Sequence, residues 1–314
     1  MILILVFLLM ILPLTTSVYA ETNTPIIVCT TSAVGSIVHE YLGESADIVV
    51  LVQPSLCPAD FDMKPSDIYA VSNAKILFQQ NIPGEFWLQS LLEAADNPNL
   101  TQVTIPGAYN TPTGASNYIQ WVGGNLSAIL DIDLEAKTSA LLADIDAVSS
   151  WMISQAQTLQ ASSVKVICMQ WLKTFIEAAG FQVAATYNPP ETLSAGDITS
   201  LVNIAQSEGV ALIVDNLQID VEFGGGIATQ VRAEHVVLTN FPGAIPSTNN
   251  LTQMFRYNAA QLFNATSPWR SSATLRAERE ALTNQVTTYQ ITTSVATILA
   301  IAEAVALYIR RRRT

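Results

Sequence analysis

The sequence predicts an α/β protein of two similar lobes with central, mostly parallel sheets, joined by one long rigid helix and followed by a C-terminal transmembrane helix. Three observations lead to this fold class. Short apolar strands alternate with amphipathic helices, the same order of elements occurs twice, and a stretch without Gly or Pro separates the two occurrences. The 314 residues are enough for two lobes, each with its own core.

Residues 21–125 are expected to form the first lobe. Apolar runs typical of buried strands occur at residues 25–30, 47–52, 74–79 and 102–105, and segments with helical spacing occur at residues 32–42, 66–72 and 86–95. The loop after the second strand is rich in proline and has the sequence PSLCPADFDMKP. Ser66 and Asp67 are suited to cap the helix that follows this loop.

One amphipathic helix is predicted to link the lobes over residues 126–161. No Gly or Pro occurs between Leu126 and Gln160, and large apolar side chains recur on one broad stripe. A break near Asp131-Ile132-Asp133 is an open alternative. A helix of about 30 residues is long enough to brace two lobes.

Residues 162–268 are expected to form the second lobe. Its strands are predicted at residues 164–168, 181–186, 210–214 and 235–238, and its helices at residues 171–179 and 197–206. Cys29 and Cys168 end the first strand of their respective lobes. Open α/β sheets bind ligands outside the carboxyl ends of their strands, so the expected ligand site is a cleft between the lobes. The triplet Gly224-Gly225-Gly226 lacks the Lys-Ser/Thr of a phosphate-binding loop and is predicted to be a flexible loop.

Both ends of the chain are apolar, which accounts for much of the mean hydropathy of +0.33. Residues 1–20 resemble a secretory signal peptide cleaved before Glu21, with an uncleaved anchor as the alternative. Residues 291–309 are predicted to be a transmembrane anchor, because they are nearly long enough to cross a bilayer and a run of arginines follows at once. Residues 269–290 would then be a juxtamembrane linker and residues 310–314 a basic cytoplasmic stub.

The charge distribution excludes nucleic acid as a partner. The chain has 14 basic and 26 acidic residues, a net charge of −12, whereas a nucleic-acid binder carries a basic face. Removing Glu303 and the four terminal arginines leaves 10 of the 14 basic and 25 of the 26 acidic residues. We therefore expect an exported cell-surface protein, anchored in the cytoplasmic membrane by its C-terminal helix, as would suit an archaeal envelope.

The sequence gives no support for an enzyme. It contains no G-x-S-x-G elbow, P-loop, H-E-x-x-H or G-x-G-x-x-G motif. The three cysteines, Cys29, Cys57 and Cys168, have no zinc or redox spacing and allow at most one disulfide bond within the chain.

The proline-rich loop carries a resemblance to a known family. The segment Pro54–Asp67, followed by IYAVSNAKILFQQN, is similar to the pattern P-G-x-D-P-H-x-[FY]-E-P-[TS]-P-S-D of the cluster A-I, TroA-like zinc/manganese solute-binding proteins of ABC importers. TTSAVGSIVHEYLG, FIEAAGFQV, GVALIVD and FPG with MFRYN continue it in the same order over residues 26–263. The resemblance implies a divalent cation held between two lobes and delivered to an ABC permease in the membrane. We expect such a binding protein to be a monomer.

The positions that correspond to the family's metal ligands do not carry zinc ligands here. The three histidines of the family pattern fall on Ala59, Tyr118 and Met169, and its late carboxylate falls on Asn240. Zinc takes about four ligands from His, Cys and carboxylate side chains. His39 and His235 are the only histidines of the chain, and we expect each to be a surface or hydrogen-bonded polar residue.

Three alternatives remain open for the site. First, neighbouring side chains would replace the metal ligands. The substitute set is Cys57, Asp60 and Asp62 in the first loop, Cys168 and Met169 in the second lobe, and Asp215 after a later strand. Because thiolate and thioether sulfur are soft ligands, this set would favour Cu(I) over zinc or manganese.

Second, the cleft would hold an organic solute in a mostly apolar site with a few polar groups. Tyr118, Trp121, Met169 and Trp171 would line it, with Asn117, Gln170 and Asn240 as neutral hydrogen-bonding groups. Third, the scaffold would bind no ligand and would instead recognise a partner protein at the cell surface. No cofactor other than the bound cargo is expected.

Overall fold

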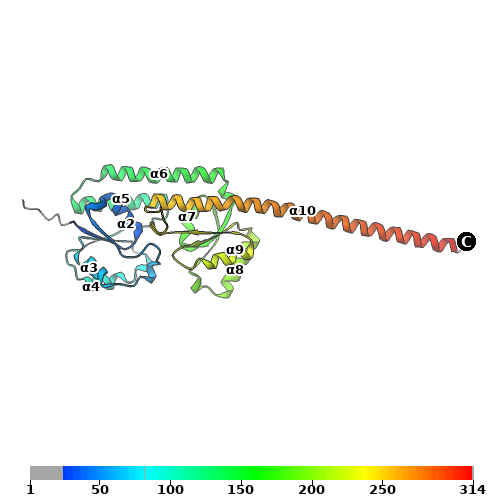
Figure 1. The fold of residues 1–314 in the computed structure, drawn as a ribbon, viewed down its shortest axis with the longest axis horizontal. Helices are drawn as coiled ribbons and strands as arrows, with labels where there is room; N and C mark the ends of the chain where they lie inside the picture. Colours follow the sequence, from blue (N-terminus) through cyan, green and yellow to red (C-terminus); the bar gives the residue numbers. More distant parts are fainter. Residues whose placement is uncertain (1–23, 81, 313–314) are drawn as a thin grey trace, which may run out of the picture.

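The structure consists of two lobes that lie side by side along a pair of helices, and of a helix that projects away from them (Figure 1). It is a computed structural model that describes residues 24–80 and 82–312. The expected signal peptide and the last two residues of the expected basic stub lie outside the described residues. Each lobe contains one four-stranded parallel sheet, which confirms the predicted fold class.

The first sheet has the strand order β2-β1-β3-β4. Its strands are β1 (Ile26–Cys29), β2 (Asp47–Val50), β3 (Ile76–Gln79) and β4 (Thr101–Thr104). The central strands are buried on both faces, as the nearly continuous apolar runs predict. Val28 and Leu77 face one core cluster, whereas Ile27 and Phe78 face the other, because successive side chains of a strand point to opposite faces.

The second sheet repeats this arrangement with the order β6-β5-β7-β8. Its strands are β5 (Lys165–Met169), β6 (Gln182–Tyr187), β7 (Leu212–Asn216) and β8 (Glu234–Leu238). In both lobes the first strand of the lobe lies between the second and the third. The predicted repetition of elements is therefore confirmed at the level of sheet topology.

Helices cover both faces of each sheet (Figure 1). They are α2 (Ser32–Leu42), α3 (Pro65–Asn73) and α4 (Leu88–Ala95) in the first lobe, and α7 (Lys173–Ala178), α8 (Ala195–Glu208) and α9 (Glu222–Val231) in the second. The cap of α3 differs from the prediction, because the helix begins at Pro65. Asp67 accepts a hydrogen bond from the Lys64 backbone N–H at 2.8 Å and so caps the helix from within its first turn.

The prediction of one uninterrupted linking helix over residues 126–161 is wrong. The alternative, with a break near Asp131-Ile132-Asp133, is confirmed. The segment forms the end of α5 (Pro112–Leu130) and then α6 (Glu135–Thr158). Asp131 ends α5 with a left-handed φ of 55°, a conformation that aspartate adopts more readily than most residues. Asp133 then accepts a hydrogen bond from the Glu135 N–H at 3.0 Å where α6 begins. α6 alone runs the length of both lobes (Figure 1).

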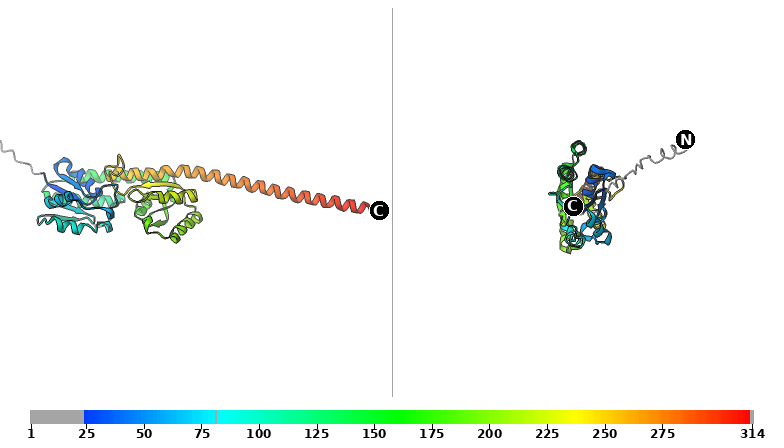
Figure 2. Two further views of the ribbon diagram at one scale, coloured as in Figure 1. Left: turned by 60° about the horizontal axis from the view of Figure 1, so that its bottom comes forward. Right: turned by 90° about the vertical axis from the view of Figure 1, so that its left-hand side faces the viewer.

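A second helix also braces the lobes. α10 (Leu251–Arg312) is one continuous helix of 62 residues, which includes residues 269–290, the expected juxtamembrane linker. Its first part packs against α6, β8 and α2. The Arg270 guanidinium donates to the Gln160 carbonyl at 3.2 Å, near the point where α10 leaves the body. Beyond it the helix projects freely (Figures 1 and 2).

The prediction that Gly224-Gly225-Gly226 forms a flexible loop is wrong, because the triplet lies inside α9. Gly224 is buried, and its N–H donates to the Asp215 carboxylate at 3.1 Å. A Cβ at position 224 would overlap that carboxylate, whereas a Cβ at position 226 would meet no atom within 4 Å. The close approach to Asp215 therefore requires glycine at position 224.

We expect Gly224→Ala to destabilise the protein by about 1–3 kcal/mol, because the added methyl group would displace a buried carboxylate. Gly226→Ala is the matched control at an exposed position of the same helix. It should stabilise the protein by about 0.5–1 kcal/mol, because glycine costs conformational entropy inside a helix. Urea unfolding measures both changes. Equal free energies of unfolding for the two variants would contradict the close contact between Gly224 and Asp215.

Candidate ligand site between the two lobes

The carboxyl ends of the two sheets lead into polar residues that meet where the lobes touch. We call this contact region the seam. It consists of Thr30, Thr31, Ser32, Pro54, Gln80, Tyr109, Asn110 and Tyr118 of the first lobe, and of Met169, Trp171, Asn216, Gln218, Thr239, Asn240, Phe241 and Pro242 of the second. Thr30 directly follows β1 and Gln80 directly follows β3, so strand direction brings them to the same edge.

Neutral side chains hold the seam together by donating to main-chain carbonyls. The pairs are Ser32 Oγ to Pro242 at 2.7 Å, Tyr109 OH to Asn240 at 2.7 Å, Asn110 Nδ2 to Trp171 at 3.0 Å, and Gln218 Nε2 to Pro54 at 2.9 Å. The Tyr109 ring also stacks on Phe241, with ring centroids 6.3 Å apart. These contacts involve no formal charge, so they close the lobes without an ion pair.

The first-lobe side of the seam is built around two tyrosines. Tyr118 donates to the Gly107 carbonyl at 2.9 Å, and its ring lies 5.6 Å from that of Tyr109. Burial raises the pKa of both phenols, so both stay protonated at neutral pH. Gln80 joins this group, because its side-chain oxygen lies in hydrogen-bond contact with the Thr31 hydroxyl.

Glu85 adds the one buried carboxylate on this side. It lies in the short 3₁₀ turn η3 (Pro83–Glu85), is 7% exposed, and accepts a hydrogen bond from the Ile82 N–H at 3.3 Å. Its charge acts on both Tyr109 and Tyr118 and contributes to their raised pKa values. Glu85 thus adds a negatively charged group beside the two phenols.

Several buried polar atoms of the seam have no hydrogen-bond partner among residues 24–80 and 82–312. They are Thr30 Oγ1, Gln80 Nε2, Asn110 Oδ1 and Asn216 Nδ2. Leaving such an atom unsatisfied costs about 1–3 kcal/mol. Both amide donors and oxygen acceptors occur among them, which is the complement that a polar cargo between the lobes would use.

Three of the four positions predicted from the family pattern, Tyr118, Met169 and Asn240, lie in the seam. Tyr118 and Asn240 come from different lobes, and Tyr109 contacts both of them. Met169 ends β5 and is fully buried, with its sulfur accepting from the Trp171 N–H at 3.3 Å. Ala59 is exposed, in the turn η2 (Pro58–Asp60).

The remaining predicted residues of the first loop and of the second lobe are more dispersed. Asp60 and Gln170 are exposed, and Cys57 is 8% exposed at the start of η2. Trp121 and Trp171 are 47% and 42% exposed. Of these two tryptophans, Trp171 reaches the seam through its carbonyl, whereas Trp121 lies on α5 and accepts a bond from Asn125 of the same helix.

Asp215 is engaged inside the second lobe. Its carboxylate accepts from the Tyr187 hydroxyl, from the Gly224 N–H at 3.1 Å, and pairs with His235 Nε2 at 2.6 Å. These partners account for a fully buried acid without a metal. The prediction that His235 is a hydrogen-bonded polar residue is confirmed, and His39 is exposed as expected.

All three cysteines are free thiols. Burial raises the pKa of Cys168 to about 12 and also raises the pKa values of Cys29 and Cys57. The carboxylates of Asp60 and Glu191 raise the pKa of Cys57 further. All three cysteines are therefore protonated thiols at neutral pH in the metal-free protein.

Across residues 24–80 and 82–312, no group of three or more His, Cys, Asp and Glu side chains is arranged to hold a metal ion. The described residues therefore do not assemble the set of His, Cys and carboxylate ligands that a zinc site needs. The donors gathered at the seam are hydroxyl, amide and carbonyl groups, with Glu85 nearby.

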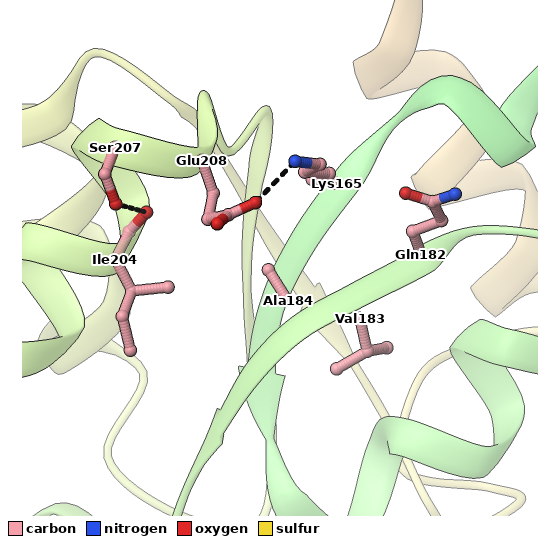
Figure 3. Close-up of a pocket in the computed structure, with 7 residues that line it drawn as sticks. All are labelled: Lys165, Gln182, Val183, Ala184, Ile204, Ser207 and Glu208. Carbon is pink, nitrogen blue, oxygen red and sulfur yellow. Dashed lines mark hydrogen bonds and ion pairs between the residues drawn. The ribbon is translucent and has the colours of Figure 1, made fainter.

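A hollow of about 490 Å³ lies away from the seam (Figure 3). It is lined by Lys165, Gln182, Val183, Ala184, Ile204, Ser207 and Glu208. Lys165 and Gln182 begin β5 and β6, so the hollow lies at the amino ends of these strands. A Lys165–Glu208 ion pair spans part of it. Ligands of such sheets bind at the opposite edge, and we assign the hollow no role.

Sequence reasoning missed Thr31, Gln80, Glu85, Tyr109 and Gln218. Thr31 and Gln80 stand directly after predicted strands, so their position at a carboxyl end was an available signal. Tyr109 and Gln218 reach the seam through loops, and only the packed lobes bring them there.

Two parallel-sheet lobes braced by a spanning helix, with a polar seam at their carboxyl ends, define the class of two-lobed binding proteins. Residues 27–265 match the family described as zinc-uptake complex component A, periplasmic. Because the match covers most of the sequence, the chain belongs to this family, whose members are uptake components rather than enzymes. The predicted family resemblance is confirmed.

Individual relatives agree with this assignment. The manganese-binding lipoprotein MntA of Halalkalibacterium halodurans is 24% identical over 200 residues, 57% of this chain and 67% of the relative. The periplasmic zinc-binding protein TroA of Treponema pallidum has a TM-score of 0.68 at 16% identity, over 78% of this chain and 99% of that one. A manganese-bound periplasmic protein of Candidatus Liberibacter asiaticus has a TM-score of 0.67 at 13% identity, over 77% and 99%. The two structures show a shared fold.

We expect Cys29 and Cys168 to resist alkylation in the folded protein between about pH 7 and about pH 9, because both are buried and mostly protonated there. Peptide mass spectrometry after iodoacetamide treatment measures the modification. Protein in concentrated guanidinium chloride is the control, in which all three cysteines should react. Rapid modification of Cys168 in the folded protein would contradict its placement.

Proposed function

We propose that this chain is the extracytoplasmic receptor of an ABC importer of the zinc/manganese uptake class, tethered by α10 and delivering its cargo to a permease in the same membrane. The observation that carries the proposal is the seam in a chain whose residues 27–265 match this uptake family. Two lobes that meet through neutral hydrogen bonds and are braced from one side by α6 can open and close on a small cargo.

The tether is supported by the composition of α10. This is the one helix among the described residues that is long and apolar enough to cross a membrane, and its apolar stretch is not buried against the lobes. Tyr289 and Tyr308 flank the apolar stretch, as interfacial aromatic residues do, and Arg310–Arg312 follow it. With this charge order the lobes would lie outside and the arginines in the cytoplasm, which agrees with the expected N-terminal signal peptide.

The family favours a divalent metal as the cargo. The seam offers oxygen donors and the Glu85 carboxylate, a set that suits manganese better than zinc. Copper(I) has less support, because Cys168 is buried within the sheet and the Met169 sulfur already accepts a hydrogen bond.

A neutral polar solute is the second candidate cargo. It is favoured by the buried amide and hydroxyl atoms of Thr30, Gln80, Asn110 and Asn216 that find no partner in the described part of the chain. A small molecule with both hydrogen-bond donors and acceptors would satisfy them and would need no carboxylate or imidazole ligand.

Elemental analysis and mass spectrometry of the protein purified without chelator distinguish the two cargoes. A metal cargo predicts near-stoichiometric manganese or zinc, at least about tenfold less in Glu85→Gln, which keeps the shape but not the charge. Glu93→Gln, an exposed position on α4, is the matched control and should retain the metal.

A neutral cargo predicts metal-free protein that releases one organic compound on denaturation, and loss of that compound in Gln80→Ala. Protein that carries neither metal nor solute, and whose melting temperature responds to neither, would contradict the receptor proposal. It would leave the role of a partner-binding surface protein.

The tether predicts that the full chain stays in the membrane fraction after an alkaline carbonate wash and is released only by detergent, because burying an apolar helix in lipid is strongly favourable. A chain that ends at Arg270 should be fully soluble and should melt at the same temperature, since every described side chain from Thr274 to Arg312 is exposed. Release of the full chain by carbonate would contradict the tether.

A further inference from the structure

α10 has two parts with different surroundings. Up to Arg270 it packs against the lobes, but from Thr274 to Arg312 every described side chain is exposed. Figures 1 and 2 show this part as a rod with no other element beside it. Helices in water gain most of their stability by packing one face, so a projecting helix of this length is expected to pair with another element.

The part before the apolar segment, residues 271–290, which we call the stalk, carries one line of large apolar side chains. Leu275, Leu282, Val286 and Tyr289 follow one another at spacings of seven, four and three residues. They are 66%, 61%, 54% and 66% exposed. This is the a/d spacing of a coiled coil, with Arg279 at the remaining a position.

We next continue the same heptad positions into the expected anchor, residues 291–309, and compare the sizes of the side chains at each position. Its a and d positions are Thr293, Ala296, Ala300, Glu303 and Leu307. Most of the outward b, c and f positions carry large apolar side chains, at Ile291, Val295, Ile298, Ile301, Val305 and Ile309, whereas Ser294 and Ala302 are small. In a bilayer small residues allow close helix packing, whereas large apolar residues suit the lipid-facing side. The a and d positions thus carry mostly large apolar side chains in the stalk and mostly small side chains in the expected anchor.

Glu303 falls on this line at a d position. A carboxyl group in a membrane segment is costly against lipid and faces a helix interface in most proteins. Its position is independent of the apolar spacing in the stalk, and both point to the same face of α10.

We propose that two copies of this chain associate in parallel through the a/d line of α10, which runs from Leu275 to Leu307. A second copy fits because both chains enter the membrane in the same direction, which sets the helices parallel and in register. The charges also agree, since Arg279 at an a position lies beside Glu278 at the preceding g position of the other copy. The monomer expected from the sequence then describes the lobes alone.

The lobes leave room for this pairing. Met254 lies on the same a/d line but is buried against its own lobe. On a straight helix a heptad line drifts by about 20° per heptad, so Leu282, four heptads later, is turned away by roughly 80°. The paired face of the stalk therefore does not point to the side on which the lobes pack. The pairing rests on the proposed tether, because the shared direction of membrane entry sets the two helices parallel.

Disulfide trapping in intact membranes tests the pairing. Leu282→Cys and Ala296→Cys are placed at d positions, and Asn284→Cys and Ile298→Cys are matched controls at f positions, all with Cys57→Ser to remove the least buried native thiol. After mild oxidation the d variants should give about tenfold more covalent dimer than the f variants, because only a/d side chains meet across a parallel pair.

Equal trapping at d and f positions, or trapping of a different protein, would overturn the proposal. Leu282→Asp with Val286→Asp provides a second measurement in detergent, where light scattering should show a change from dimer to monomer. This double variant should still resist carbonate extraction. A failed tether would release every variant from the membrane, whereas failed pairing would leave the full chain membrane-bound and monomeric.

Discussion

The parallel pairing of the strands in both sheets is the constraint on which the rest of the structure depends. In a parallel sheet every strand ends at the same edge, so the residues after β1, β3, β7 and β8 gather without being neighbours in sequence. Because α6 runs along both lobes, these two edges are held against each other (Figure 1). The seam follows from strand direction and this brace.

The elements that the sequence predicts well are those fixed by local patterns. The strands were predictable because their central segments are apolar runs, and the repeat was predictable because both lobes use the same order. The break at Asp131 and the helix around Gly224 were harder, because each depends on a backbone conformation or a tertiary contact. A glycine triplet is compatible with a flexible loop and with a helix. Only the contact between Gly224 and Asp215, which the sequence does not reveal, explains why the triplet lies in a helix.

The candidate site also contains some residues that the sequence predicts and others that only the structure reveals. Tyr118 and Asn240 were found by aligning the family pattern, and Tyr109 bridges them in the structure. Tyr109 itself, Gln80 and Glu85 carry no motif, and their roles arise from burial beside one another. Conversely, Asp215 was predicted to be a substitute metal ligand after a strand. In the structure its carboxylate already forms hydrogen bonds with Tyr187, His235 and Gly224. Its partners come from three elements that no local pattern connects.

Neutral and oxygen-bearing groups at the seam are the groups that would recognise the cargo. The most direct measurement is a crystal structure of the protein purified from its native membrane without chelator. We predict non-protein electron density enclosed between the lobes, in contact with both the Gln80–Tyr118 side and the Asn216–Asn240 side. A bound cargo located in the hollow beside Lys165 and Glu208, with no density in the seam, would contradict the account.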